Sequence, residues 1–254
     1  MRSIKMEPMI SLQLWSVQEA CEEDFLGTLT KVKEFGYDGV EFAGYYGLDA
    51  DVIKEHLDKL GLKVSGSHIA AGKLKEDLAG TIEFEKKIGN NTIIIPWIES
   101  GSKDKWEENF AFFNEIQPVI ESAGMLLSYH NHSHEFTEIT NFSALEEMLK
   151  SVPKMKLEVD TYWVNFAGED TLEWLENYKK YIDCLHIKDA IKLENDFEST
   201  ELGKGILPLK DYAKFGADNQ LRWLVIEQEA FQELLPMESA AYNQKVLRTI
   251  LKEV

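Results

Sequence analysis

The chain has 254 residues, of which 44% are hydrophobic and 28% charged, as is typical of soluble globular proteins. Its formal net charge of −18 would repel a phosphate backbone, so we do not expect a nucleic-acid partner. Two cysteines, Cys21 and Cys184, are too few for a disulfide framework, and no apolar run reaches membrane-spanning length. We therefore expect a cytoplasmic protein without a membrane partner.

Short apolar runs alternate with amphipathic stretches along the whole chain, which predicts a parallel sheet with right-handed crossovers. Three amphipathic stretches end in Gly36, Gly61 and Gly124, a common stop signal for helices, and a new apolar run soon follows each. The predicted strands cover residues 9–15, 39–43, 63–69, 92–97, 125–131, 156–160, 184–189 and 223–229.

Eight strand–helix units in about 250 residues match the size of a (β/α)8 barrel. A doubly wound open sheet is the alternative, but it usually has a glycine-rich turn after the first strand. The corresponding segment here, WSVQEACEED, contains no glycine. We therefore expect an α/β fold, a TIM barrel that forms a single domain over residues 1–254.

Ionisable side chains fall at or near the C-terminal ends of six predicted strands. In a TIM barrel these ends meet on one face, where active sites lie. A buried carboxylate is costly unless it is paired or bound to a metal, so several converging acids indicate a cation between them. The residues concerned are Glu41, His68, His130, His132, Glu158, Asp160, His186, Lys188, Glu227 and Glu229.

Taken singly, each of these residues also has a structural interpretation. Glu41 or His68 would serve equally well as a structural residue, and Glu158 as a satisfied interior acid. The tryptophans Trp15, Trp97 and Trp163 would fit a hydrophobic core. The coincidence of Asp160, His186 and Glu227 at the ends of three successive strands favours a functional site.

The segment YHNHSHEF, residues 129–136, ends the preceding strand with three histidines and a glutamate. It either contributes a metal ligand or is a polar loop rich in histidine. His130, His132 and Glu135 are the candidate ligands from this strand.

These motifs together resemble the sugar phosphate isomerase/epimerase superfamily, the xylose-isomerase-like barrels. The resemblance covers nearly the whole chain and is strongest in SLQLWSV, GYDGVEFAGYYG, SGSHI, YHNHSHEF, LEVDTYWV, CLHIKD, ELGKGILPL and LVIEQE. It implies a divalent metal held by side chains from strands five to eight. By resemblance these ligands are Asp160, His186 and Glu227, with Glu135 favoured over His132 and His130 through similarity to the YHPH…E segment of inosose dehydratases.

The family pattern also implies chemistry and substrate contacts. Such a ligand set suits Mn²⁺, Mg²⁺ or Co²⁺, with Zn²⁺ as an alternative. Glu135 and Glu227 would act as acid and base on a proton next to a substrate carbonyl. Substrate binding is expected from Glu41, His68, His132, Lys188, Trp15, Trp97 and Trp163.

The expected function is an isomerase or epimerase of a sugar, a sugar phosphate or a keto-polyol. The alternative is a lyase on the same scaffold, similar to inosose dehydratases or acting on a 3-keto-glycoside. Tagatose-type epimerases carry a histidine three residues after the aspartate ligand, where this chain has Trp163. Two alternatives are weaker. The net charge of −18 argues against an endonuclease-IV-like nuclease, and the complete set of expected ligands argues against a non-catalytic sugar-binding barrel.

Overall fold

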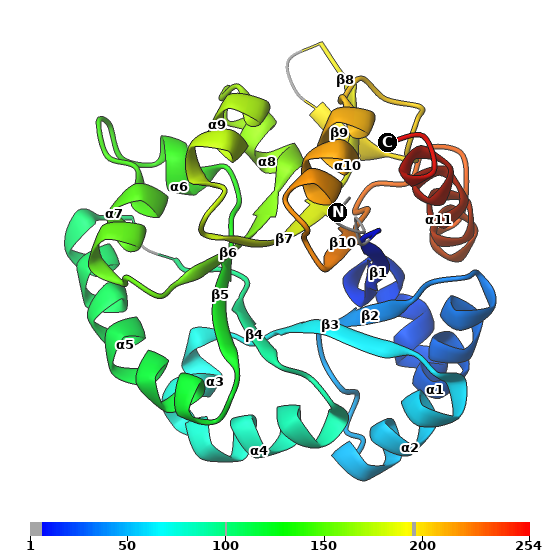
Figure 1. Cartoon of the computed structure of the whole chain (residues 1–254), viewed down its shortest axis with the longest axis horizontal. Coiled ribbons are helices and arrows are strands. Elements are labelled where there is room, and N and C mark those ends of the chain that lie inside the picture. Colours follow the sequence, from blue (N-terminus) through cyan, green and yellow to red (C-terminus); the bar gives the residue numbers. More distant parts are fainter. Residues whose placement is uncertain (1–6, 100, 195–196) are drawn as a thin grey trace, which may run out of the picture.

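The computed structural model of the protein describes residues 7–99, 101–194 and 197–254. Within these residues eight parallel strands close into a barrel in the order β1-β10-β7-β6-β5-β4-β3-β2. The helices surround this ring of strands (Figure 1), which confirms the predicted (β/α)8 barrel. The barrel strands are β1 (Met9–Gln13), β2 (Gly39–Phe42), β3 (Lys63–His68), β4 (Thr92–Ile95), β5 (Leu126–His130), β6 (Lys156–Asp160), β7 (Ile182–Ile187) and β10 (Trp223–Ile226).

The helical layer follows the expected order, with short helices added in the loops. None of the helices in the described ranges combines the length and the apolar composition needed to cross a membrane. The helices are η1 (Leu14–Val17), α1 (Gln18–Glu34), α2 (Ala50–Leu60), α3 (Ala71–Glu76), α4 (Leu78–Ile88), α5 (Lys103–Ser122), α6 (His134–Thr137), α7 (Ala144–Ser151), α8 (Thr161–Phe166), α9 (Thr171–Tyr178), α10 (Leu209–Asp218) and α11 (Pro236–Leu251).

Glycines end three of the outer helices as predicted. Gly36, Gly61 and Gly124 have φ angles of +97°, +60° and +78°, in the left-handed region that glycine adopts without a steric penalty. Each one reverses the chain after its helix, so that the next strand begins within a few residues.

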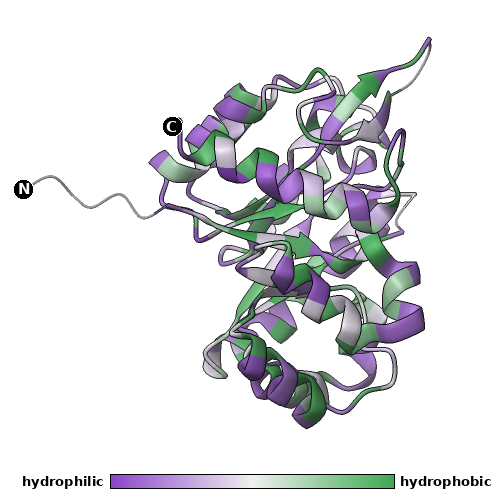
Figure 2. Ribbon diagram, turned by 90° about the vertical axis from the view of Figure 1, so that its right-hand side faces the viewer, coloured by the Kyte–Doolittle hydropathy of each residue, from purple (hydrophilic) through white to green (hydrophobic). Residues whose placement is uncertain are grey.

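The barrel strands alternate between the helix layer and a polar interior. Ile10 and Leu12 of β1 are buried against the helices, and Figure 2 shows the central strands mainly in the hydrophobic colour. Ser11 points the other way, and its Oγ lies 2.7 Å from Ser65 Oγ on β3. Because β2 separates β1 from β3 in the sheet, this contact crosses the barrel interior. Gly39 leaves room there, since a Cβ at this position would lie 2.7 Å from the Trp223 ring.

Several predicted strands extend past the observed strand ends. The strand predicted over residues 9–15 ends at Gln13, where η1 begins, and that over 223–229 ends at Ile226. The largest difference concerns residues 184–189: the barrel strand β7 ends at Ile187, and Asp189 begins a separate antiparallel hairpin of β8 (Asp189–Lys192) and β9 (Phe197–Thr200). This hairpin lies at the top of Figure 1, beside α10.

Candidate active site

Four side chains from four neighbouring barrel strands meet at the C-terminal ends of those strands. His130, Asp160, His186 and Glu227 are buried, and one ligand atom of each lies within 4.8 Å of the others. The Nδ1 atom of His186 lies 3.1 Å from Glu227 Oε2 and 3.2 Å from His130 Nε2. Three of these residues, Asp160, His186 and Glu227, are the predicted ligands from strands six to eight, and the fold brings them together.

Local structure explains how Asp160 is oriented. It is the last residue of β6 and the N-cap of α8, and its Oδ1 accepts hydrogen bonds from the backbone N–H groups of Tyr162 and Trp163 at 2.9 and 3.3 Å. Its own backbone N–H donates to Asn131 Oδ1 at 3.0 Å. The second carboxylate oxygen, Oδ2, is therefore held toward His130 and Glu227.

The donor group fits a divalent cation. The ligand atoms that face one another include His130 Nε2 and Asp160 Oδ2, which are 3.5 Å apart. Asp160 Oδ2 makes no hydrogen bond of acceptable geometry, and its charge is balanced by the Lys188 ammonium at 2.9 Å. Two carboxylates and two imidazoles form a mixed oxygen and nitrogen set, which first-row divalent metals accept.

The ammonium group of Lys188 lies among the same carboxylates. Its Nζ is 2.9 Å from Asp160 Oδ2, 2.7 Å from Glu227 Oε2 and 3.0 Å from Glu229 Oε2. Burial alone would raise the pKa of Asp160, but Lys188 and His130 oppose this and lower that pKa to about 2. Lys188 likewise lowers the pKa of Glu227, so Asp160 and Glu227 are held ionised around a positive charge.

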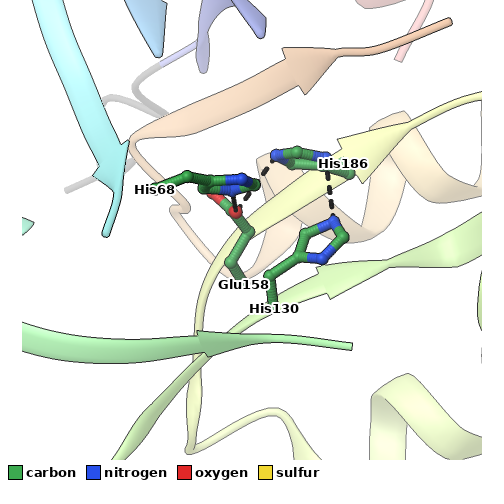
Figure 3. A group of neighbouring side chains, drawn as sticks. All are labelled: His68, His130, Glu158 and His186. Carbon is green, nitrogen blue, oxygen red and sulfur yellow. Dashed lines mark hydrogen bonds and ion pairs between the residues drawn. The ribbon is translucent and has the colours of Figure 1, made fainter. Parts of the chain in front are cut away.

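A second layer of charges lies beneath this group, on the barrel interior (Figure 3). His68, His130, Glu158 and His186 point toward one another from β3, β5, β6 and β7. The Nε2 atom of His186 is 2.8 Å from Glu41 Oε1 and 3.1 Å from Glu158 Oε2, on the side of the ring opposite Glu227. The two ring nitrogens of His186 therefore face two different groups of acids.

His68 belongs to this inner layer. Its Nε2 lies 2.8 Å from Glu158 Oε2 and 3.1 Å from Glu41 Oε1. Burial would lower the pKa of His68, but the two carboxylates outweigh it and raise the pKa to about 9.

Glu41 was predicted to bind substrate hydroxyls. Its side chain is fully buried, and it also accepts a hydrogen bond from Gln13 Nε2 at 2.7 Å. Gln13 was not predicted from the sequence, since a single amide in an apolar strand carries no functional signal.

Glu135, the predicted fifth-strand ligand, lies apart from Asp160, His186 and Glu227. Its Oε1 accepts from the hydroxyl of Tyr129 at 2.7 Å, and its Oε2 accepts from the backbone N–H of His132 at 2.8 Å. Burial raises the pKa of Glu135 despite these contacts. The ligand atoms of Glu135, His132 and His134 form a separate group, and His130 fills the fifth-strand place beside Asp160.

A cavity of about 430 Å³ opens above the buried charges. It is lined in part by Trp15, Trp97, His68, His132, Glu227 and Glu229. Trp15 and Trp97 are 48% and 49% exposed, so their rings are available to a ligand. Desolvation and the nearby His130 and Lys188 lower the pKa of His132 to about 2, which keeps this imidazole neutral.

The other residues predicted to contact substrate lie close to this cavity. The ring of Trp163 is 5.4 Å from that of His132, and the ammonium of Lys188 is 5.5 Å from the centre of the Trp163 ring. Glu229 is a cavity residue that lies beyond the end of β10, two positions after Glu227, and was not assigned a role from the sequence. The tetrad of buried donors below an aromatic-walled cavity at a barrel mouth is the architecture of a TIM-barrel enzyme site.

Comparison with known proteins agrees with this architecture. A family model described as "Xylose isomerase-like TIM barrel" matches residues 29–250, and the chain belongs to this family. An inosose dehydratase of Clostridium botulinum is 20% identical over 271 residues, which cover 89% of this chain and 90% of the relative.

Solved structures show the same fold. A sugar phosphate isomerase/epimerase from Parabacteroides distasonis superposes with a TM-score of 0.79 at 23% identity, covering 93% of this chain and 96% of that one. The structure of L-ribulose 3-epimerase gives a TM-score of 0.74 at 15% identity, over 97% and 95% of the two chains.

Proposed function

We propose that the protein is a divalent-metal-dependent isomerase or epimerase of a sugar, a sugar phosphate or a keto-polyol. The observation that carries this proposal is the meeting of His130, Asp160, His186 and Glu227 within 4.8 Å of one another below an aromatic-walled cavity. The family, whose relatives include enzymes named for carbohydrate chemistry, supports it.

In this proposal Asp160, His186 and Glu227 hold the metal, and His130 is the fourth ligand in place of Glu135. Two imidazoles beside two carboxylates favour Mn²⁺, Co²⁺ or Zn²⁺ over Mg²⁺, which prefers oxygen ligands. When bound, the cation supplies Lewis acidity that polarises a substrate carbonyl. Glu41 and Glu158 contact the Nε2 side of His186 and thereby orient its Nδ1 toward the metal position.

The chain's own acids move the proton. Glu227 and Glu229 line the cavity, so either carboxylate can accept the proton next to the polarised carbonyl and return it to the neighbouring carbon or the opposite face. Lys188 contacts both acids; it lowers the pKa of Glu227, which keeps that carboxylate ionised, and would bind a substrate oxygen. Glu135, predicted as the second acid or base, lies outside the lining of this cavity, and its role stays a prediction.

Substrate binding follows from the character of the cavity walls. The rings of Trp15 and Trp97 present apolar faces for the C–H groups of a sugar, while His68 and the neutral His132 offer nitrogen atoms to its hydroxyls.

A lyase is the second candidate function. The curated relatives at about one-fifth identity are named inosose dehydratase, and Trp163 replaces the histidine expected of a tagatose-type epimerase. Dehydration begins with the same proton removal, so the two functions share every residue named above and differ in what leaves the substrate.

Proton exchange tests both candidates together. The protein, supplied with Mn²⁺ in D₂O, is incubated with a panel of ketohexoses and inososes, and deuterium entry next to the carbonyl is followed by NMR. We expect exchange that requires the metal and is lost in Asp160→Asn. Product mass after a parallel incubation in H₂O then separates the functions, because isomerisation conserves mass and dehydration loses water. Full exchange in Asp160→Asn would refute the assignment.

A further inference from the structure

A second cavity of about 510 Å³ adjoins the one above the metal position. It lies between η1 with the start of α1 on one side and the segment between β10 and α11 on the other. Trp15 and Glu229 line both cavities, so the two lie on either side of these side chains. We call the second cavity the outer groove; it is lined by Trp15, Ser16, Val17, Gln18, Glu19, Ala20, Glu23, Gln228, Glu229, Phe231, Leu235, Pro236, Met237 and Glu238.

The floor of the outer groove is fixed by hydrogen bonds. Ser16 Oγ accepts from the backbone N–H of Gln228 at 2.9 Å, which ties the start of the chain to the segment after β10. The side chain of Gln228 donates to the carbonyl of Ala230 and accepts from Asn243 Nδ2, at 2.9 and 2.8 Å. The buried Ser16–Gln228 contact joins the two sides of the groove, and the contacts of the Gln228 side chain fix the second side, so the shape of the groove exists before any ligand binds.

The walls of the outer groove combine exposed apolar surface with acids. Trp15 is 48% exposed and Leu235 is 70% exposed, and Phe231 and Met237 are half-buried. Such surface on one side of a cavity is typical of ligand sites, where rings pack on aromatic faces. The lining contains four glutamates, Glu19, Glu23, Glu229 and Glu238, and neither lysine nor arginine.

This charge selects the ligand. Glu229 is paired with Lys188, but Glu19, Glu23 and Glu238 leave the lining negatively charged. This charge would repel a phosphate or a carboxylate, whereas carboxylates are strong acceptors for hydroxyl groups. A neutral ring with hydroxyls on its edge and C–H groups on its face matches both features of the lining. The position of the groove beside the reacting centre means that such a ring would be joined to the substrate ring.

We propose that the outer groove is a subsite for a neutral second ring, so that the substrate is a glycoside whose reacting ring lies above the metal position. This inference rests on the proposed function for the location of the reacting ring. Trp15 would pack against both rings, and Glu19 and Glu23 would accept hydrogen bonds from hydroxyls of the second one.

Calorimetric titration of the Mn²⁺-loaded protein with one-ring and two-ring probes tests the subsite. The probes are glucose and three glucosyl-glucoses of different linkage, maltose, cellobiose and trehalose. We expect at least one disaccharide to bind about 10-fold more tightly than glucose, the gain that one additional aromatic contact typically provides. Equal or undetectable binding of all four sugars would overturn the proposal.

The substitution Phe231→Ala tests whether the outer groove provides the gain in disaccharide affinity. Phe231 lines the outer groove and not the cavity above the metal position. Its removal should therefore abolish the preference for the disaccharide and leave glucose affinity unchanged. Leu172→Ala is the matched control, because Leu172 is 37% exposed on α9 and lines another surface. A preference that survives in Phe231→Ala would place the second ring elsewhere.

The titration also separates this inference from the proposed function. Binding requires no turnover, so a disaccharide preference without deuterium exchange would leave the groove assignment intact and refute the reaction. Deuterium exchange on ketohexoses without any disaccharide preference would support the proposed reaction and refute the second-ring subsite.

Discussion

At the scale of single residues, the identity of the fifth-strand ligand depends on side-chain directions that spacing does not reveal. Asp160, His186 and Glu227 could be predicted because each ends a strand and strand ends converge in a barrel. The segment 129–136 offers several donors within a few residues, and these donors differ in their tertiary contacts. Tyr129 binds Glu135 through its hydroxyl, whereas His130 remains beside Asp160.

Alanine substitution at the two positions distinguishes the candidates. His130→Ala should lower Mn²⁺ affinity at least about 100-fold, since even outer-shell changes typically cost 10- to 100-fold. Glu135→Ala should leave the affinity within a few-fold but lower the free energy of unfolding by about 1–3 kcal/mol, because it leaves the buried Tyr129 hydroxyl unpaired. Calorimetry and urea unfolding measure the two effects. The reverse pattern of affinities would restore Glu135 as the ligand.

At the scale of elements, the barrel strands and outer helices can be predicted from apolar periodicity and from the glycines that end helices. The hairpin of β8 and β9 cannot. The segment CLHIKD reads as one strand, yet the chain leaves the barrel after Ile187 and Asp189 begins β8. Asp189 holds this change of direction, because its buried carboxylate accepts from the backbone N–H groups of Ala190, Gly203, Gly205 and Leu207. Those donors lie up to 18 residues along the chain, beyond the reach of local patterns.

Asp189→Asn tests that role. Its amide group can accept at one oxygen only, so two of the four backbone donors would lose their acceptor. We expect urea unfolding to show a loss of about 2–4 kcal/mol. Asp211→Asn on the exposed surface of α10 is the control and should unfold like the unmodified protein. Equal stability of both variants would show that Asp189 does not hold the segment.

The helix α4 carries a buried acid with a predictable pH dependence. Burial raises the pKa of Glu85 above its usual 4.5, although Tyr45 and Asn90 donate hydrogen bonds to it. An acid with a raised pKa in the folded state keeps its proton there after the unfolded chain has lost it. Its contribution to stability is therefore present at low pH and lost as the pH rises through the folded pKa.

Glu85→Gln removes this titration and keeps a neutral side chain of similar shape. The melting temperature of the variant, relative to that of the unmodified protein, should increase from pH 5 to pH 8. A difference in melting temperature that is constant over this range would mean that Glu85 ionises normally in the folded chain.

At the scale of the whole molecule, the barrel gathers charges that its sequence keeps far apart. The interior holds Glu41, His68, Glu158 and His186 in one group of contacts, and Asp160, Glu227 and Lys188 in another. The contact between His186 and Glu227 joins the two groups. Parity along each strand predicted that these side chains point inward, but not which of them touch. The site exists only in the folded chain, where the barrel brings these residues together. A cation that binds there should therefore raise the free energy of unfolding of the whole domain.

The melting temperature measures this stabilisation by the bound cation. At a Mn²⁺ concentration 100-fold above the dissociation constant, the stabilisation should be about 2.7 kcal/mol, which corresponds to roughly 5–10 °C for a chain of this size. Asp160→Asn should show little or no shift. A similar shift in both proteins would point to binding elsewhere on the acidic surface.

The most direct test of the account is a calorimetric titration of the chelator-treated protein with Mn²⁺. We expect one tight site per chain, and at least about 100-fold weaker binding in Asp160→Asn, for the reason that a lost ligand costs more than an outer-shell change. Absence of tight binding in the unmodified protein, or equal binding in both, would contradict the assignment of His130, Asp160, His186 and Glu227 as a metal site.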